Sequence, residues 1–157
     1  YAMTGWRVGW MVGPDDLIAA ASNLQSHATS NVANVAQRAS LAAITGGFEA
    51  VEVMRAAFDR RRRLMFDMLS EIEGVELLEP QGAFYTFPDL SSFLNRPIGG
   101  HTARTTVELA TTILDHAKIA LVPGEAFGAP GYARLSFALA DDQLMEGLTR
   151  LGGFLSD

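Results

Sequence analysis

The sequence of 157 residues contains no cysteine and a single lysine, Lys118, and both scarcities limit its chemistry. Without cysteine the chain has no disulfide, thiol nucleophile or zinc–thiolate site. Such a composition suits a reducing compartment, so we expect a cytoplasmic protein. Lys118 opens a short expected strand directly after a helix, and no neighbour would activate it. We therefore interpret Lys118 as an exposed lysine and not as the nucleophile of a Schiff-base enzyme.

Long apolar runs and an excess of positive charge are also missing. No run approaches the ~20 apolar residues of a membrane-spanning helix, so we expect no membrane partner. The formal net charge is −6, whereas a nucleic-acid groove would require a basic stripe, so we expect no nucleic-acid partner. His27, His101 and His116 are scattered, without metal-ligand spacing, and we therefore expect no metal site.

The chain does contain alternating helical and strand-like patterns. Hydrophobic residues make up 48% of the sequence, which is enough for a folded core. Helical periodicity and clusters of β-branched and aromatic residues predict the elements. The expected helices span about 17–24, 32–45, 49–73, 103–117 and 142–155, and the expected strands span about 4–12, 75–78, 83–87, 119–122 and 132–138.

The longest expected helix, from Glu49 to Glu73, changes character halfway along. Its apolar stripe is interrupted at Arg61, within a run of four arginines from Arg60 to Arg63 that we interpret as a solvated face. A helix whose burial changes along its length can pass from one domain into another. We therefore predict a domain boundary at this run, with residues 61–157 forming a small α/β layer domain.

Two arginines are candidate binding residues because each interrupts an apolar strand-like segment. A guanidinium is costly to bury unpaired, and its fork of donors fits a phosphate or a carboxylate. Arg7 stands between Gly5 and Gly9, which leave room for a ligand near the backbone, although a structural ion pair is the alternative. Alternation places Arg134 on the polar face of its strand, where it binds a substrate carboxylate or is merely solvated.

Three further patterns have structural interpretations beside functional ones. Phe84 and Tyr85 wall a pocket or belong to the core. The glycine-rich turn at residues 123–128 lacks the spacing and the lysine of a phosphate loop. Asp141 or Asp142 is expected to cap the last helix. From the residues alone, therefore, no complete catalytic set emerges.

Four short segments follow one another in an informative order. They are residues 1–10 (YAMTGWRVGW), 81–85 (QGAFY), 122–128 (VPGEAFG) and 134–138 (RLSFA). Together they resemble fold-type I pyridoxal-phosphate-dependent aminotransferases. The segment LQSHATSNVANVAQ, residues 24–37, resembles the bacterial aspartate aminotransferase branch.

This resemblance covers essentially the whole chain and implies its fold. The expected class is α/β, the PLP-transferase fold type I. Residues 1–60 would be the end of the large cofactor-binding domain, including the start of the long connecting helix, and residues 61–157 would be the small C-terminal α/β domain.

The resemblance also implies roles for individual residues. Arg7 would hold the phosphate of pyridoxal 5'-phosphate, Arg134 would bind the substrate α-carboxylate, and Phe84 would line the substrate pocket. Ser30 and Asn31 would lie in a loop near the dimer interface and the neighbouring active site.

The catalytic lysine of such enzymes would stand just upstream of Tyr1. We therefore expect no catalytic residue in this chain, which we interpret as a C-terminal fragment that is inactive alone. The resemblance implies a homodimer that transfers an amino group between an amino acid, with aspartate as the expected donor, and a 2-oxo acid. The alternatives are aromatic, prephenate or diaminopimelate-pathway substrates, a lyase or decarboxylase of the same fold, and a non-catalytic remnant or interaction module.

Overall fold

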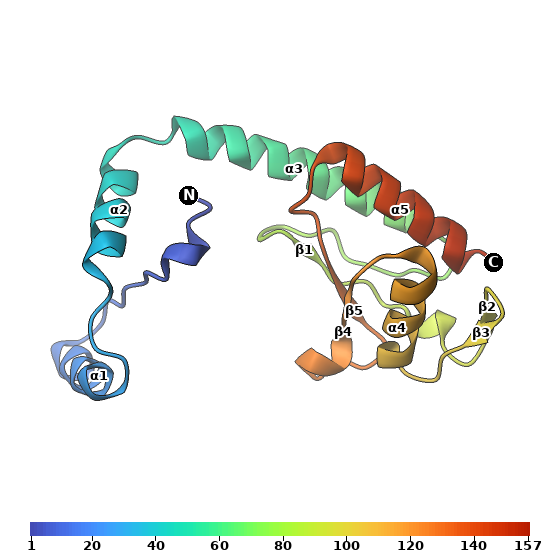
Figure 1. Cartoon of the computed structure of the whole chain (residues 1–157), viewed down its shortest axis with the longest axis horizontal. Coiled ribbons are helices and arrows are strands. Elements are labelled where there is room, and N and C mark those ends of the chain that lie inside the picture. Colours follow the sequence, from blue (N-terminus) through green and yellow to red (C-terminus); the bar gives the residue numbers. More distant parts are fainter. The chain divides into compact units, whose positions relative to one another are not determined.

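The computed structural model describes residues 1–157 and divides the chain into two compact units, Tyr1–Met54 and Arg55–Asp157. The division falls within helix α3 (Glu49–Ser70), a few residues before the arginine run at which the sequence predicts a domain boundary (Figure 1). The assignment of the two parts to a large and a small domain remains a prediction. None of the helices combines the length and the apolar character needed to cross a bilayer.

The first unit contains little core of its own. It consists of the short 3-10 helix η1 (Thr4–Trp6), the helices α1 (Asp15–Ala28) and α2 (Asn34–Thr45), and the first turns of α3. Ala36 is its only buried hydrophobic residue, whereas the side chains of Val12 and Leu24 are 91% and 71% exposed. The apolar face expected on α1 therefore has no packing partner within this unit.

The strand predicted over residues 4–12 is not formed, and this prediction was wrong. Residues 4–6 form η1 instead, and Arg7 ends it in the left-handed region at φ 53°. Strand hydrogen bonds join different strands, and every strand of the structure lies in the second unit. The strand preference of this segment thus has no partner to satisfy it.

The second unit is a small α/β arrangement around a three-stranded antiparallel sheet. The strand order is β1–β5–β4, and a separate hairpin pairs β2 with β3 (Figure 1). The strands are β1 (Tyr85–Thr86), β2 (Pro97–Ile98), β3 (His101–Thr102), β4 (Val122–Pro123) and β5 (Ala133–Ser136). The helices are the rest of α3, α4 (Thr106–Ala117) and α5 (Asp141–Leu155), with the 3-10 turns η2 (Ser91–Phe93) and η3 (Gly124–Phe127).

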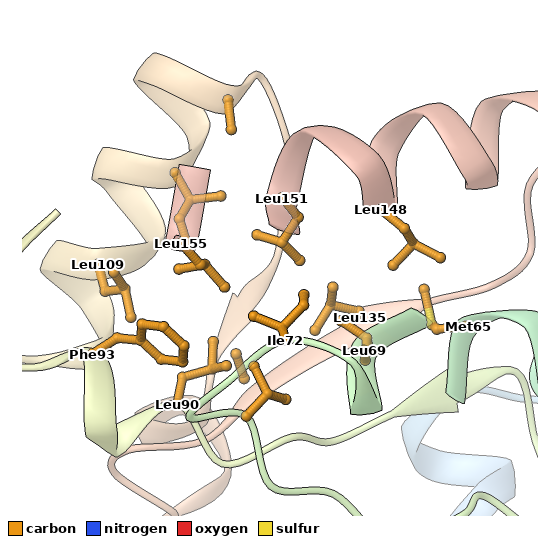
Figure 2. Close-up of a cluster of buried hydrophobic side chains, with 14 of the residues drawn as sticks. Met65, Leu69, Ile72, Leu90, Phe93, Leu109, Leu135, Leu148, Leu151 and Leu155 are labelled. Carbon is orange, nitrogen blue, oxygen red and sulfur yellow. The ribbon is translucent and has the colours of Figure 1, made fainter. Parts of the chain in front are cut away.

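The core of the second unit forms where α3, α4, α5 and β5 meet. The apolar stripe predicted on the last helix is confirmed: its leucines are at most 4% exposed, and Figure 2 shows Leu148 and Leu151 directed toward Met65 and Leu69 of α3. Full burial of one such side chain stabilises a fold by about 1.5–3 kcal/mol. The buried stripe on α5 comprises Leu144, Leu148, Leu151 and Leu155.

The alternation predicted for the strand around Arg134 is also confirmed. Leu135 and Phe137 are 5% and 1% exposed and belong to the core, whereas Arg134 and Ser136 are half-buried on the other face. The register sets Ser136 opposite Tyr85 of β1 and Arg134 opposite Val122 of β4. The strand expected over residues 75–78 is reduced to one isolated bridge between Glu76 and Asp89.

The arginine run forms ion pairs, so its interpretation as a merely solvated face was wrong. Arg60 and Arg61 both bind the carboxylate of Asp141, which ties α3 to the first turn of α5. Hydrogen bonds from Arg61 and then Arg60 lower the pKa of the Asp141 carboxyl below its usual value. The expected cap is also absent, because the N-cap position of α5 is Ala140 and no side chain caps it.

Arg62 of the same run ties α3 to the segment that precedes β1. It binds the carboxylates of Asp59 and Glu79, and its Nη1 donates to the carbonyl of Pro80 at 2.9 Å. The hydrogen bond with Glu79, followed by that with Asp59, raises the pKa of Arg62. The bonds from Arg62 to Glu79 and Pro80 fix the position of the segment that leads to Phe84 and Tyr85.

Candidate functional site

The guanidinium of Arg134 packs against two aromatic rings from different elements. Its Cζ lies 4.3 Å from the ring centroid of Tyr85 in β1 and 4.9 Å from that of Phe127 at the end of η3. A cation over an aromatic ring face is attracted by the ring quadrupole. These contacts hold the guanidinium of β5 at the place where β1 and the turn after β4 meet.

Arg134 has no carboxylate partner. The ion pairs of this unit are made by Arg60 to Arg63 and by Arg150, and no side-chain hydrogen bond occupies the donors of Arg134. Because the guanidinium is half-buried and its ring contacts leave the N–H edge free, it can donate two parallel hydrogen bonds to a carboxylate. The geometry thus provides an anion site without a resident anion from the chain.

Phe84 lies behind Tyr85 and contacts the core. Its ring centroid lies 4.4 Å from that of Tyr85 and 6.2 Å from that of Phe58 in α3. It is partly buried and packed on the hydrophobic core cluster. Phe84 therefore joins the core to the ring that Arg134 faces, so both interpretations of this aromatic pair have support.

Phe127 is a site contact that the sequence reasoning did not identify. It belongs to the glycine-rich turn, and Gly124 at the start of that turn has no room for a side chain, because a Cβ there would lie 2.0 Å from the carbonyl oxygen of Ala129. The Gly124 N–H donates to the carbonyl of Tyr132 at 2.7 Å, which closes the turn. The available signal was the aromatic residue within a tight turn just before the strand of Arg134.

Arg7 presents an exposed guanidinium in the first unit. Its Nη1 donates to the carbonyl of Thr4 at 3.1 Å, and no carboxylate pairs with it. The expectation that Arg7 lies within an apolar strand was wrong. The residue directly follows the 3-10 helix η1, and it is exposed to solvent. An unpaired guanidinium fits a phosphate, so the residue suits the phosphate group of a cofactor.

Ser30 and Asn31 form the turn that ends α1. Ser30 has a φ of 58°, and its N–H donates to the carbonyl of Gln25 at 2.9 Å. The Asn31 side-chain amide donates to the carbonyl of Val32 at 3.0 Å. Both residues are exposed and border a hollow of about 560 Å³ within the first unit.

The predicted site residues are thus divided between the two units. Arg7, Ser30 and Asn31 belong to the first unit, and Arg134 and Phe84 belong to the second. Within the second unit the structure brings Arg134 and Phe84 onto the same ring, that of Tyr85.

Two of the histidines lie close together, whereas the single lysine lies apart at the surface. His101 and His116 lie with their ring centroids 4.1 Å apart, so these two residues are not scattered in space as they are in sequence. The structure contains no cluster of three or more potential metal ligands. Lys118 is exposed, as expected, and its Nζ donates to the carbonyl of Asp115 at 2.7 Å.

Comparison with known families decides the affiliation of the chain. Residues 1–151 match the model of the family described as aminotransferase class I and II. The chain belongs to this family. Its aminotransferase relatives confirm the expected α/β PLP-transferase fold, and enzymes of this family depend on pyridoxal 5'-phosphate.

Several individual aminotransferases are similar over nearly the whole chain. An aspartate aminotransferase of Streptomyces avermitilis is 59% identical over 100% of this chain, which spans 38% of that relative. An aspartate/prephenate aminotransferase of Cereibacter sphaeroides is 41% identical over 98% of this chain and 39% of the relative. The crystal structure of the aspartate aminotransferase from Rhizobium meliloti matches with a TM-score of 0.90 and 36% identity, over 99% of this chain and 39% of that one.

Proposed function

We propose that this chain is the C-terminal part of an aminotransferase that moves an amino group between aspartate and a 2-oxo acid. The single observation that carries the proposal is the unpaired, ring-supported guanidinium of Arg134. Both substrates of such a reaction carry a carboxylate next to the reacting carbon. The names of the similar aspartate aminotransferases support aspartate as the amino donor.

Arg134 acts by orienting the substrate. Two parallel hydrogen bonds to the α-carboxylate fix the direction of the carboxylate plane, and with it the direction of the bond from Cα to its hydrogen. Orientation of a reacting bond can supply several kcal/mol of the barrier. Tyr85 and Phe127 keep the guanidinium from turning away when the substrate leaves, and Phe84 supports Tyr85 from the core side.

The cofactor assignment rests on the family and on the chemistry of Arg7. Pyridoxal 5'-phosphate, when bound, supplies an electron sink for the carbanion chemistry at Cα. Arg7 would bind its phosphate, since its guanidinium is exposed and has no carboxylate partner. Ser30 and Asn31, in an exposed turn beside a hollow, would face the second subunit of a homodimer. We place this homodimer in the cytoplasm, on the absence of cysteine.

The direct test uses the full-length protein that contains this chain, loaded with pyridoxal 5'-phosphate. Addition of aspartate should shift the visible absorption band of the cofactor, and 2-oxoglutarate should then restore it as glutamate appears. The α-amide of aspartic acid (isoasparagine), which lacks the free α-carboxylate, is the matched control and should leave the band nearly unchanged. A protein whose band responds to neither substrate contradicts the proposal.

A second candidate is transfer to prephenate, favoured by the relative from Cereibacter sphaeroides named aspartate/prephenate aminotransferase. The ratio of kcat/KM for prephenate to that for 2-oxoglutarate decides between the two acceptors. A non-catalytic remnant of the same fold would lack a lysine just upstream of Tyr1 and would bind no cofactor covalently.

A further inference from the structure

We infer that Glu125 and Thr106 are positioning residues for the carboxylate site at Arg134. The inference rests on the proposed function and deepens it, because it identifies what holds one wall of that site in place. The wall is the turn at residues 124–131, which carries Phe127.

Thr106, the first residue of α4, holds this turn at both ends. Its backbone N–H donates to Oε1 of Glu125 at 3.0 Å, and its Oγ1 accepts from the N–H of Gly131 at 2.7 Å. Thr106 itself is completely buried. A hydrogen bond in such surroundings is costly to lose, because the buried donor or acceptor that remains cannot form a replacement hydrogen bond with water.

Between these two anchor points the turn is closed by backbone hydrogen bonds. Gly124 accepts from the N–H of Ala129 at 2.9 Å, and the N–H of Gly128 donates to the carbonyl of Glu125 at 3.2 Å. The turn is therefore expected to move as one piece when an anchor is released. Phe127 would move with it, and it supplies one of the two rings on Arg134.

The ring of Phe127 also packs against a second aromatic residue, Phe87. Its ring meets Phe87 edge-on, with centroids 5.8 Å apart, and Phe87 stacks on Tyr132 at 5.3 Å. A displaced turn would thus disturb the ring packing of Phe127, Phe87 and Tyr132 as well as the contact between Phe127 and Arg134. The expected result is a looser Arg134, whose donors no longer point in one direction.

Helix capping alone does not account for the hydrogen bond made by Glu125. Helix α4 already has an N-cap, Thr105, whose side chain accepts from the N–H of Glu108 at 3.2 Å. What Glu125 adds is a link between the helix and the turn. Its other oxygen, Oε2, is buried without a hydrogen-bond partner, so the link to Thr106 depends on Oε1 alone.

The experiment compares four variants of the full-length enzyme. Glu125→Ala and Thr106→Val each remove one anchor, whereas Glu125→Gln keeps the acceptor for the Thr106 N–H. Thr105→Ala is the matched control, because it weakens the N-terminus of the same helix without touching the turn. The measurements are hydrogen exchange of the amides in residues 124–132, calorimetric binding of succinate as a carboxylate probe, and KM and kcat for aspartate.

Glu125→Ala and Thr106→Val should accelerate amide exchange in the turn and raise both the Kd for succinate and the KM for aspartate about tenfold, with a smaller fall in kcat because a loosened Arg134 orients the bound substrate less well. Glu125→Gln and Thr105→Ala should keep wild-type affinity. The inference is overturned if the turn loosens while succinate affinity stays constant, if Thr105→Ala has the same effect, or if the wild-type protein does not bind succinate. A wild-type enzyme that binds succinate without transferring amino groups would contradict the proposed function alone, because the succinate series still decides the positioning role.

Discussion

At Arg134, contacts with two rings take the place of the ion pair that a half-buried guanidinium ordinarily makes. Two half-buried arginines of α3, Arg61 and Arg62, are neutralised by carboxylates of the chain. Arg134 instead keeps its hydrogen-bonding edge free and lets Tyr85 and Phe127 cover part of its surface. The free edge is the chemical basis for assigning a carboxylate ligand to this residue.

In the full-length enzyme, Arg134→Ala should lower kcat/KM for aspartate about a thousandfold, since a charged two-pronged contact contributes roughly 4 kcal/mol. The visible band of the bound cofactor should persist, because Arg7, and not Arg134, is the residue proposed to bind its phosphate. Arg150→Ala is the control, since Arg150 is exposed and pairs only with Glu146, at 3.8 Å. Near-normal turnover of the Arg134 variant would remove this residue from its role.

At the scale of elements, α5 is held by two different kinds of contact. Its apolar stripe packs on α3 and β5 (Figure 2), and its first turn is tied to α3 by the ion pairs of Asp141. The apolar stripe is buried, whereas the ion pairs lie near the surface and are screened by solvent. The two contacts therefore respond differently to mutation and to pH.

The packing of the apolar stripe of α5 should contribute more to the stability of the second unit than the ion pairs of Asp141. Leu151→Ala should lower the free energy of unfolding by about 2–5 kcal/mol, because it leaves a cavity in a closely packed core. Met145→Ala, on the exposed side of the same helix, should change it by less than about 0.5 kcal/mol. Urea unfolding of the two variants measures this difference, and equal midpoints would contradict the packing of α5 described here.

The ion pairs should appear as a pH dependence. Because Arg61 and Arg60 lower the pKa of Asp141 in the folded state, folding favours its charged form. The resulting stabilisation is complete above the ordinary aspartate pKa of about 4 and is lost as the pH falls through the lower pKa of the folded state. Asp141→Asn should thus reduce Tm at pH 7, and its deficit against the wild-type protein should shrink below about pH 4.

Asp142→Asn is the matched control for this titration. Asp142 lies in the same first turn of α5 but makes no ion pair. Its substitution should leave the Tm profile close to that of the wild-type protein. A constant Tm deficit of Asp141→Asn from pH 7 to pH 3 would show that the charge of Asp141 is not the cause.

At the scale of the whole molecule, the two units differ in how much apolar surface they bury. The second unit has a continuous core that extends through α3, α4, α5 and the sheet. The first unit buries a single hydrophobic side chain, Ala36, and leaves Trp10 77% exposed. Helices of this length are marginal in water unless an apolar face is packed.

We therefore expect the chain of 157 residues, produced by itself, to show two levels of protection. Backbone amides of α1 and α2 should exchange with deuterium within minutes, whereas those of β5 and of the buried side of α5 should be protected for hours. Hydrogen-exchange mass spectrometry on peptides from each element measures this contrast. Equal protection of α1 and α5 would mean that the first unit obtains stability from contacts beyond its own packing.

The predictions that succeeded concern patterns that repeat over a few residues. The leucines of α5 and the alternation of Arg134 with Leu135 follow directly from helical and strand periodicity. The segments that resemble aminotransferases likewise identified the family, because each is a short local motif. Periodicity failed where a partner was required, as in the segment at residues 4–12, whose strand preference finds no second strand.

By itself, therefore, the sequence determined the family, the apolar face of α5, and the arginine that faces away from the core. Only the tertiary structure decided that Phe127 and Tyr85 meet on Arg134, that Asp141 binds arginines instead of capping a helix, and that Thr106 holds Glu125. The physical reason is the separation in sequence over which each feature is decided. Side-chain periodicity is set by the local backbone. Contacts between residues far apart in the chain depend on how whole elements pack, which no local pattern encodes.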